Sequence, residues 1–138
     1  DRLIERGYFY DGSVAYDPRT GYQEARLVAH TVEASHGIVL LPFIIPNDWD
    51  ARRIQGLTAP QMLQAWSDRL KVVANAHEPC FVLDVHQWLI TEPDNFAALR
   101  GFIREVKARG DCRFLTLDGT AHHVLNGIGH LETAGIGK

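Results

Sequence analysis

The chain has 138 residues, of which 46% are hydrophobic, so it is the size of one ordinary domain and can bury a core. Its net charge is -3 and its Lys and Arg residues are scattered, which excludes the basic surface that binds nucleic acid or anionic membranes. It contains no apolar run of the roughly 18 residues that a membrane span requires. We expect one soluble domain without a nucleic-acid or membrane partner, and its composition leaves open whether it is cytoplasmic or secreted.

The first part of the chain predicts short elements separated by a long loop. Residues 1–6 are typical of the last turns of a helix that Gly7 ends, and residues 8–11 predict a strand. Because the chain starts inside a helix pattern, without Met, we expect further sequence upstream. Residues 12–25 are rich in Gly, Pro and Asp and predict a loop. Two further strands are predicted, over residues 27–32 and 38–41.

Two amphipathic helices follow, each with a recognisable start or stop. Thr58 can cap the first, which we expect to run through about Ala76. The second begins at Pro93 or Asp94 and ends at Gly110. The residues that share the apolar faces are Met62, Leu63, Trp66, Leu70 and Val73 in the first, and Phe96, Leu99, Ile103 and Val106 in the second.

Two apolar segments, residues 81–90 and 113–117, alternate with these helices and predict strands. Strand, helix, strand, helix, strand is typical of parallel strands with helical crossovers, in an open sheet or a barrel. The fold class expected from the sequence is therefore α/β, with residues 127–138 as a loosely held tail.

The segment from Phe81 to Ile90 is the most informative part of the sequence. Side chains of a strand alternate between its faces, which places Asp84, His86 and Trp88 on one side. A carboxylate and an imidazole two residues apart can hold each other's protonation state. The alternative interpretation is a core histidine whose ring is satisfied by a neighbouring strand.

A second polar group, Asn47-Asp48-Trp49, also follows an apolar strand-like run. Ligands of parallel sheets gather at the carboxyl ends of strands, so this group and His86 are candidates for one pocket. Asp48 could instead cap a helix or lie in a solvated turn. For Trp49 and Trp88 the alternatives are ordinary packing and an aromatic wall that stacks on a sugar.

Three segments resemble, in order, the polysaccharide deacetylase superfamily (NodB-homology domain, carbohydrate esterase family four). They are Gly7-Tyr8-Phe9-Tyr10-Asp11-Gly12-Ser13, Pro46-Asn47-Asp48-Trp49 and Leu83-Asp84-Val85-His86-Gln87-Trp88-Leu89-Ile90. The resemblance extends to about Val124 and covers only the C-terminal half of that domain. It implies that residues 1–126 form the C-terminal half of a deformed (β/α) barrel, with residues 127–138 as a C-terminal tail.

The resemblance also implies an activity, hydrolysis of an amide by water that a divalent metal, usually zinc, activates in the complete domain. His86 takes the place of the general acid, and Asp48 that of the carboxylate that keeps the imidazole charged. Trp49 lines the substrate groove, with Asn47 and Trp88 as further substrate-binding residues. The expected substrate is an N-acetylated sugar or polysaccharide.

Two alternatives stay open. Ile45 stands where the family has an acidic residue, Asp84 where it often has leucine, and Phe43, Ile44 and Ile45 form an apolar rim. The apolar rim resembles that of relatives in the same superfamily that hydrolyse small cyclic amides or imides, which leaves the substrate class open. The other alternative is a non-catalytic half-barrel that binds a ligand, with its exposed edges covered by the missing N-terminal half or by a second copy of the chain.

The family's catalytic Asp pair and metal-binding histidines precede the matched region. Candidate ligands within the chain are His30, His36, His77, His122, His123 and His130, and only the adjacent His122 and His123 are close in sequence. We therefore expect the isolated chain to hold no metal and to hydrolyse no amide. Cys80 and Cys112 precede two predicted neighbouring strands, so both a disulfide and two free thiols are open.

Overall fold

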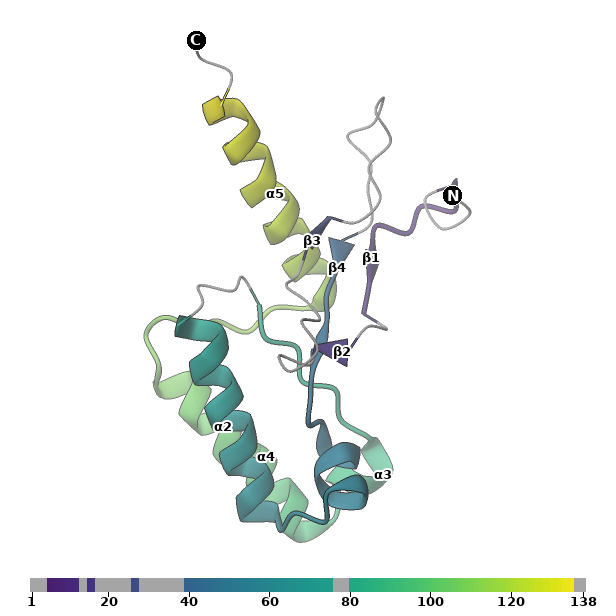
Figure 1. Ribbon diagram of the computed structural model, residues 1–138, viewed down its shortest axis with the longest axis vertical. Coiled ribbons are helices and arrows are strands. Elements are labelled where there is room, and N and C mark those ends of the chain that lie inside the picture. Colours follow the sequence, from purple (N-terminus) through teal and green to yellow (C-terminus); the bar gives the residue numbers. More distant parts are fainter. Residues whose placement is uncertain (1–4, 13–14, 17–25, 28–38, 76–79, 136–138) are drawn as a thin grey trace.

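The computed structural model describes residues 5–12, 15–16, 26–27, 39–75 and 80–135 (Figure 1). Its strands are β1 (Tyr10–Asp11), β2 (Ala15–Tyr16), β3 (Arg26–Leu27), β4 (Val39–Leu40) and β5 (Phe43–Ile44). One sheet has the order β1-β4-β3, in which β1 is parallel and β3 antiparallel to β4. In the other, β2 lies parallel to β5, and Phe43 of β5 bridges Val82 in parallel. Parallel pairing is therefore present, but the described strands do not close into a barrel.

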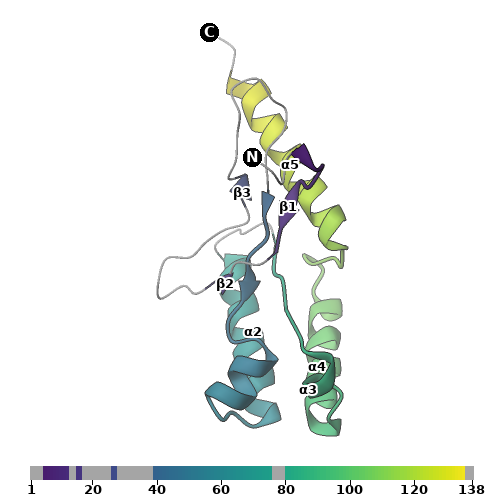
Figure 2. The ribbon, with the colours of Figure 1, turned by 90° about the vertical axis from the view of Figure 1, so that its right-hand side faces the viewer.

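Helices make up most of the described chain. They are the π-helical turn η1 (Asp50–Ile54) and the α-helices α2 (Ala59–Asn75), α3 (Gln87–Ile90), α4 (Pro93–Ala108) and α5 (Leu117–Gly135). Helices α2 and α4 pack on each other, while α5 lies at the other end of the molecule beside β1 and β4 (Figures 1 and 2). Among the described residues, no helix is long and apolar enough to cross a membrane.

Two hydrophobic clusters hold these parts together. The larger joins η1, α2, α3 and α4, and its fully buried centre includes Met62 and Trp66 of α2. The smaller joins β4 to α5 through Val39, Leu41 and Ala121. Burial of a large apolar side chain is worth about 1.5–3 kcal/mol, so the larger cluster carries most of the packing energy.

The helix predicted from Thr58 is confirmed as α2. The Gln61 side-chain oxygen accepts the Thr58 N–H at 2.8 Å, and the Thr58 hydroxyl accepts the Gln61 N–H at 3.4 Å, which is a capping box. The predicted apolar face is also confirmed, with Leu63 half-buried and the other members buried. Gly101 of α4 lets the two helices approach, since a Cβ there would lie 3.1 Å from the Leu63 Cδ2 atom.

The second predicted helix is confirmed as α4, but its buried face differs in part from the predicted one. Phe96 is exposed, and the buried positions are Asn95, Ala98, Phe102 and Val106. Asn95 is buried because its Nδ2 atom donates to the Leu89 carbonyl at 3.0 Å and so ties α4 to α3. The two faces overlap, because Val106 is buried and Leu99 and Ile103 are half-buried, but sequence periodicity alone does not register the polar contact that buries Asn95.

The strand predicted over residues 81–90 is only partly correct. Val82 makes a single bridge, residues 83–86 have no regular secondary structure, and Gln87 to Ile90 form α3. The amides of Leu89 and Ile90 both donate to the His86 carbonyl, at 2.9 and 2.8 Å. The side chains of Leu89 and Ile90 are both buried in this turn. A strand that continued to Ile90 would not bury both of them.

The strand predicted over residues 113–117 is wrong, since the described residues there pair with no other strand. Phe114, Leu115 and Leu117 are exposed. A strand needs a neighbour to accept its hydrogen bonds, and α5 already begins at Leu117. Residues 127–135, expected in a tail, continue α5. Most of the predicted loop 12–25 and of the predicted strand 27–32 lies outside the described residues.

Candidate active site

Asp48 lies at the end of a segment that α2 holds in place. The indole Nε1 of Trp66 donates to the Pro46 carbonyl at 2.9 Å, and Arg69 Nε donates to the Ile45 carbonyl at 3.0 Å. Trp66 is fully buried, as expected from its place on the apolar face. A buried indole N–H needs an acceptor, and here that acceptor belongs to the segment leading into Asp48. The position of Asp48 therefore depends on the core of the α2/α4 pair.

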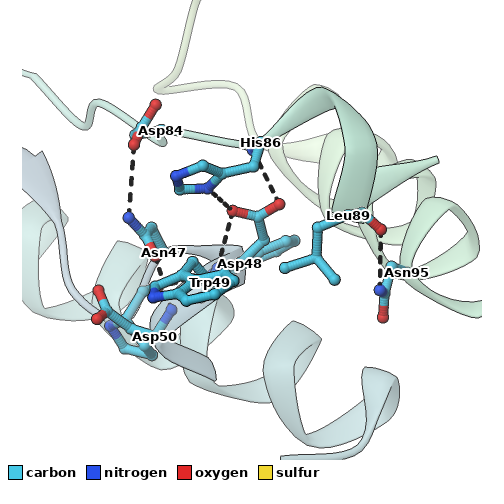
Figure 3. A network of polar contacts seen from close by, with 10 residues as sticks. Asn47, Asp48, Trp49, Asp50, Asp84, His86, Leu89 and Asn95 are labelled. Atoms are coloured by element: carbon cyan, nitrogen blue, oxygen red, sulfur yellow. Dashed lines mark hydrogen bonds and ion pairs between the residues drawn. The ribbon is translucent and has the colours of Figure 1, made fainter. Parts of the chain in front are cut away.

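The Asp48 carboxylate is fully buried and accepts three hydrogen bonds. Its Oδ1 atom accepts the Trp49 N–H at 2.9 Å and contacts His86 Nδ1 at 2.7 Å, and its Oδ2 atom accepts the His86 N–H at 2.9 Å. Buried charge is costly unless it is paired and hydrogen-bonded, and this carboxylate is both. The backbone of His86 is thus held by the same group that contacts its ring (Figure 3).

His86 is oriented by this contact. A carboxylate can only accept, so Nδ1 carries the proton on that side of the ring and Nε2 is left on the side away from Asp48 (Figure 3). The pKa of His86 is raised, first by the hydrogen bond to Asp48 and further by negative charge on Asp48, Asp84 and Asp50, while desolvation opposes the rise. The side chain is 34% exposed, so the charged imidazole can meet a ligand.

The predicted partnership of His86 with Asp84 is replaced by the contact with Asp48. Asp84 is exposed, and its Oδ2 atom instead accepts a long hydrogen bond of 3.4 Å from the Asn47 Nδ2 atom. Asn47 is buried, and its Oδ1 atom accepts the Asp50 N–H at 2.8 Å. Both ends of the Asn47 amide are therefore engaged within the protein, and Asn47 links η1 to the segment of His86.

Two tryptophans lie around the imidazole. The Trp49 ring centroid is 6.2 Å from that of His86, and the Trp88 centroid is 5.6 Å from it. The two indoles meet edge to face with centroids 5.3 Å apart. Trp49 is 38% and Trp88 58% exposed, so both present ring surface to solvent. The structure brings together His86, Asp48, Asn47, Trp49 and Trp88 of the residues singled out in the sequence.

The expected apolar rim of Phe43, Ile44 and Ile45 is less exposed than a rim would be. Ile44 is buried in β5, whereas Phe43 and Ile45 are only half-buried. Sequence reasoning missed the tie from Trp66 to Pro46, because hydrophobic spacing identifies a core position but not the acceptor of its N–H. It also missed the link that Asn47 makes, for which the sequence offers no signal beyond the neighbouring acids.

The outcome for the remaining metal and cysteine candidates differs from residue to residue. His30, His36 and His77 fall outside the described residues, as does the side chain of His130. His122 lies 3.9 Å from Asp118 on the surface of α5, and among the described residues no three His, Cys, Asp or Glu side chains gather as a metal group. No disulfide joins Cys80 and Cys112, both of which are half-buried.

Comparison with known proteins gives a fold relationship. No protein-family model and no curated protein matches the sequence. A protein from Pseudomonas aeruginosa PAO1 assigned as a polysaccharide deacetylase has a similar crystal structure, with a TM-score of 0.72 and 21% identity over 88% of this chain and 40% of that one. A protein from Mycobacterium smegmatis with the same assignment has a TM-score of 0.73 and 25% identity, over 91% of this chain and 44% of that one.

The chain thus has the fold of part of a polysaccharide deacetylase, and it spans less than half the length of either solved structure. This agrees with the partial match expected from the sequence segments. In those proteins the fold is a (β/α) barrel; the described part of this chain has the parallel pairs β1-β4 and β2-β5, followed by its helices, and does not form a barrel.

Proposed function

We propose that this chain is the C-terminal part of a metal-dependent amide hydrolase of the polysaccharide deacetylase superfamily, which removes acetyl groups from N-acetylated sugars. The observation that carries the proposal is the contact between the buried Asp48 carboxylate and the partly exposed His86 imidazole, 2.7 Å long. The similarity to two solved deacetylases supports it.

In this proposal, His86 is the general acid. When the carbon-nitrogen bond of an amide breaks, the departing amine must gain a proton, and an imidazolium at neutral pH can supply it. The hydrogen bond from Nδ1 to Asp48 raises the pKa of His86 and so favours the protonated ring that a general acid needs. Nε2 is then the donor to the leaving nitrogen, and Asp48 keeps the ring in the orientation that presents it.

Trp49 and Trp88 are the proposed substrate-binding residues. The flat apolar face of a sugar ring stacks on an exposed indole, and the two indoles flank the proton donor. Asn47 is proposed to hold Asp84 and Asp50 in position, because its buried amide is hydrogen-bonded to both of these residues.

The divalent metal of the complete domain remains part of the proposal by resemblance alone. The described residues do not assemble a metal group, and no step is assigned to a metal held by them. By the same resemblance, we assign activation of the attacking water to the N-terminal half of the domain. The missing N-terminal half is the proposed partner.

Acetate release from N-acetylated chito-oligosaccharides by the full-length product of the gene tests the proposal. We expect His86→Ala to lower kcat by roughly two to four orders of magnitude while the variant stays folded, losing only the stabilisation that the pair with Asp48 provides. His122→Ala is the matched control, because His122 is also an exposed histidine near a carboxylate. Equal activity of both variants would overturn the role of His86, and no release by the wild type would overturn the function.

A further inference from the structure

Asp84 lies beside the proposed proton donor and is not used by the mechanism. Leu83 and Val85 pack against the large core cluster, so the intervening Asp84 points to the opposite side of the segment, as His86 does. Side chains two residues apart on an extended chain lie about 7 Å from each other. Figure 3 shows the Asp84 carboxylate on the side of the imidazole away from Asp48, where Nε2 lies.

The Asp84 carboxylate keeps most of its capacity to bind a ligand. Its hydrogen bond from Asn47 is long, at 3.4 Å, and the residue is exposed. The arginines of the neighbouring η1 turn are engaged elsewhere, since Arg52 donates to the Leu57 carbonyl and Arg53 lies 3.3 Å from Glu92. Asp84 therefore places a negative charge next to a ligand that approaches His86.

The adjoining aromatic surface favours the same kind of ligand. Trp49 and Trp88 both expose ring surface next to His86. An indole face attracts a cation and also stacks on a sugar ring. A carboxylate at the edge of this surface distinguishes a sugar that carries a protonated amine from one whose nitrogen is acetylated and neutral.

We infer that Asp84 is a specificity-determining residue, which makes the site prefer chains in which a sugar with a free, protonated amine lies next to the N-acetylated sugar. This inference rests on the proposed function and names its substrate class as partly deacetylated amino-sugar chains. Because the ion pair is exposed, we expect a preference of about two- to fivefold rather than a strict requirement.

Binding to the full-length product of the gene, with its metal removed by a chelator so that the ligands are not hydrolysed, tests this inference through tryptophan fluorescence. The ligands are a fully N-acetylated chitotetraose and a partly deacetylated tetramer, each titrated at a pH where the free amine is protonated and at low ionic strength. We expect the wild type to bind the partly deacetylated tetramer about two- to fivefold more tightly, and Asp84→Asn to abolish the difference. Asp118→Asn, which removes an exposed carboxylate on α5, should retain it.

Each outcome has a distinct meaning. Equal binding of the two tetramers by the wild type, or a preference that survives in Asp84→Asn, overturns the inference but leaves a sugar-binding site in place. Failure of the wild type to bind either tetramer overturns both the inference and the carbohydrate substrate of the proposed function. A preference lost in both variants would also contradict a local role of Asp84.

Discussion

The Nδ1 atom of His86 lies 2.7 Å from the Oδ1 atom of Asp48, which stands 38 residues earlier in the chain. The same carboxylate accepts the backbone N–H of His86 through its other oxygen, at 2.9 Å. Two bonds from one buried group thus fix both the main chain and the ring of a residue that reaches solvent. The first two predictions test this arrangement.

Replacing Asp48 by Asn should lower the pKa of His86. The hydrogen bond from Asp48 is the largest cause of the raised pKa, and an amide of the same shape carries no charge to hold the proton. The check is an NMR titration of the His86 ring in wild type and Asp48→Asn. A His86 pKa that stays the same, in a variant shown by its spectrum to be folded, would contradict the assigned cause.

The pH dependence of stability follows from the same shift. The pKa of His86 is higher in the folded chain than its unfolded value of about 6.5, so the folded state binds the proton more tightly. The stabilisation from this pair is complete below that unfolded pKa and is lost as the pH rises through the raised folded pKa. Urea unfolding across this pH range should show the loss in wild type and a smaller one in His86→Asn. Parallel curves for the two proteins would contradict the linkage.

Replacing Trp66 by Phe should affect both the core and the site. The variant keeps an aromatic ring but removes the N–H that donates to the Pro46 carbonyl at 2.9 Å. Leaving that buried acceptor unpaired and the ring smaller should lower the free energy of unfolding by about 1–3 kcal/mol. Thermal or urea denaturation measures this loss. The matched control is Trp88→Phe, since Trp88 is exposed, and a loss of equal size there would argue against the special role of Trp66.

We expect the isolated 138-residue chain to retain no stoichiometric zinc after dialysis. Structural zinc sites need four ligands and catalytic sites need three, and the described residues gather no group of three. Elemental analysis of the dialysed protein is the measurement. One zinc per chain would show that this polypeptide contains a site of its own, and a change of His122 to Ala would then test whether α5 provides it.

Short-range sequence patterns were sufficient to predict the two longer helices, α2 and α4. The capping residues around Thr58 and the spacing of Met62, Trp66 and Leu70 predicted α2, and the Pro93 start predicted α4. The alternation of Leu83, Asp84 and Val85 was also correctly read, because it follows from an extended backbone whether or not a sheet forms.

Contacts over long sequence separations could not be obtained in this way. The strand expected at residues 113–117 depends on a neighbour that the described chain does not provide. Within the site, strand-end positions predicted that Asp48 and His86 share a pocket, but sequence proximity pointed to Asp84 as the partner of the imidazole, and the pairing with Asp48 came only from the resemblance.

The indole of Trp66 belongs at once to the packing of α2 against α4 and to the support of the strand end that carries Asp48. Warming that loosens the two helices would therefore release the carboxylate from the imidazole in the same event. Proton donation and the global fold should be lost over one temperature interval. We expect no temperature at which the protein is still folded while the contact between Asp48 and His86 is broken.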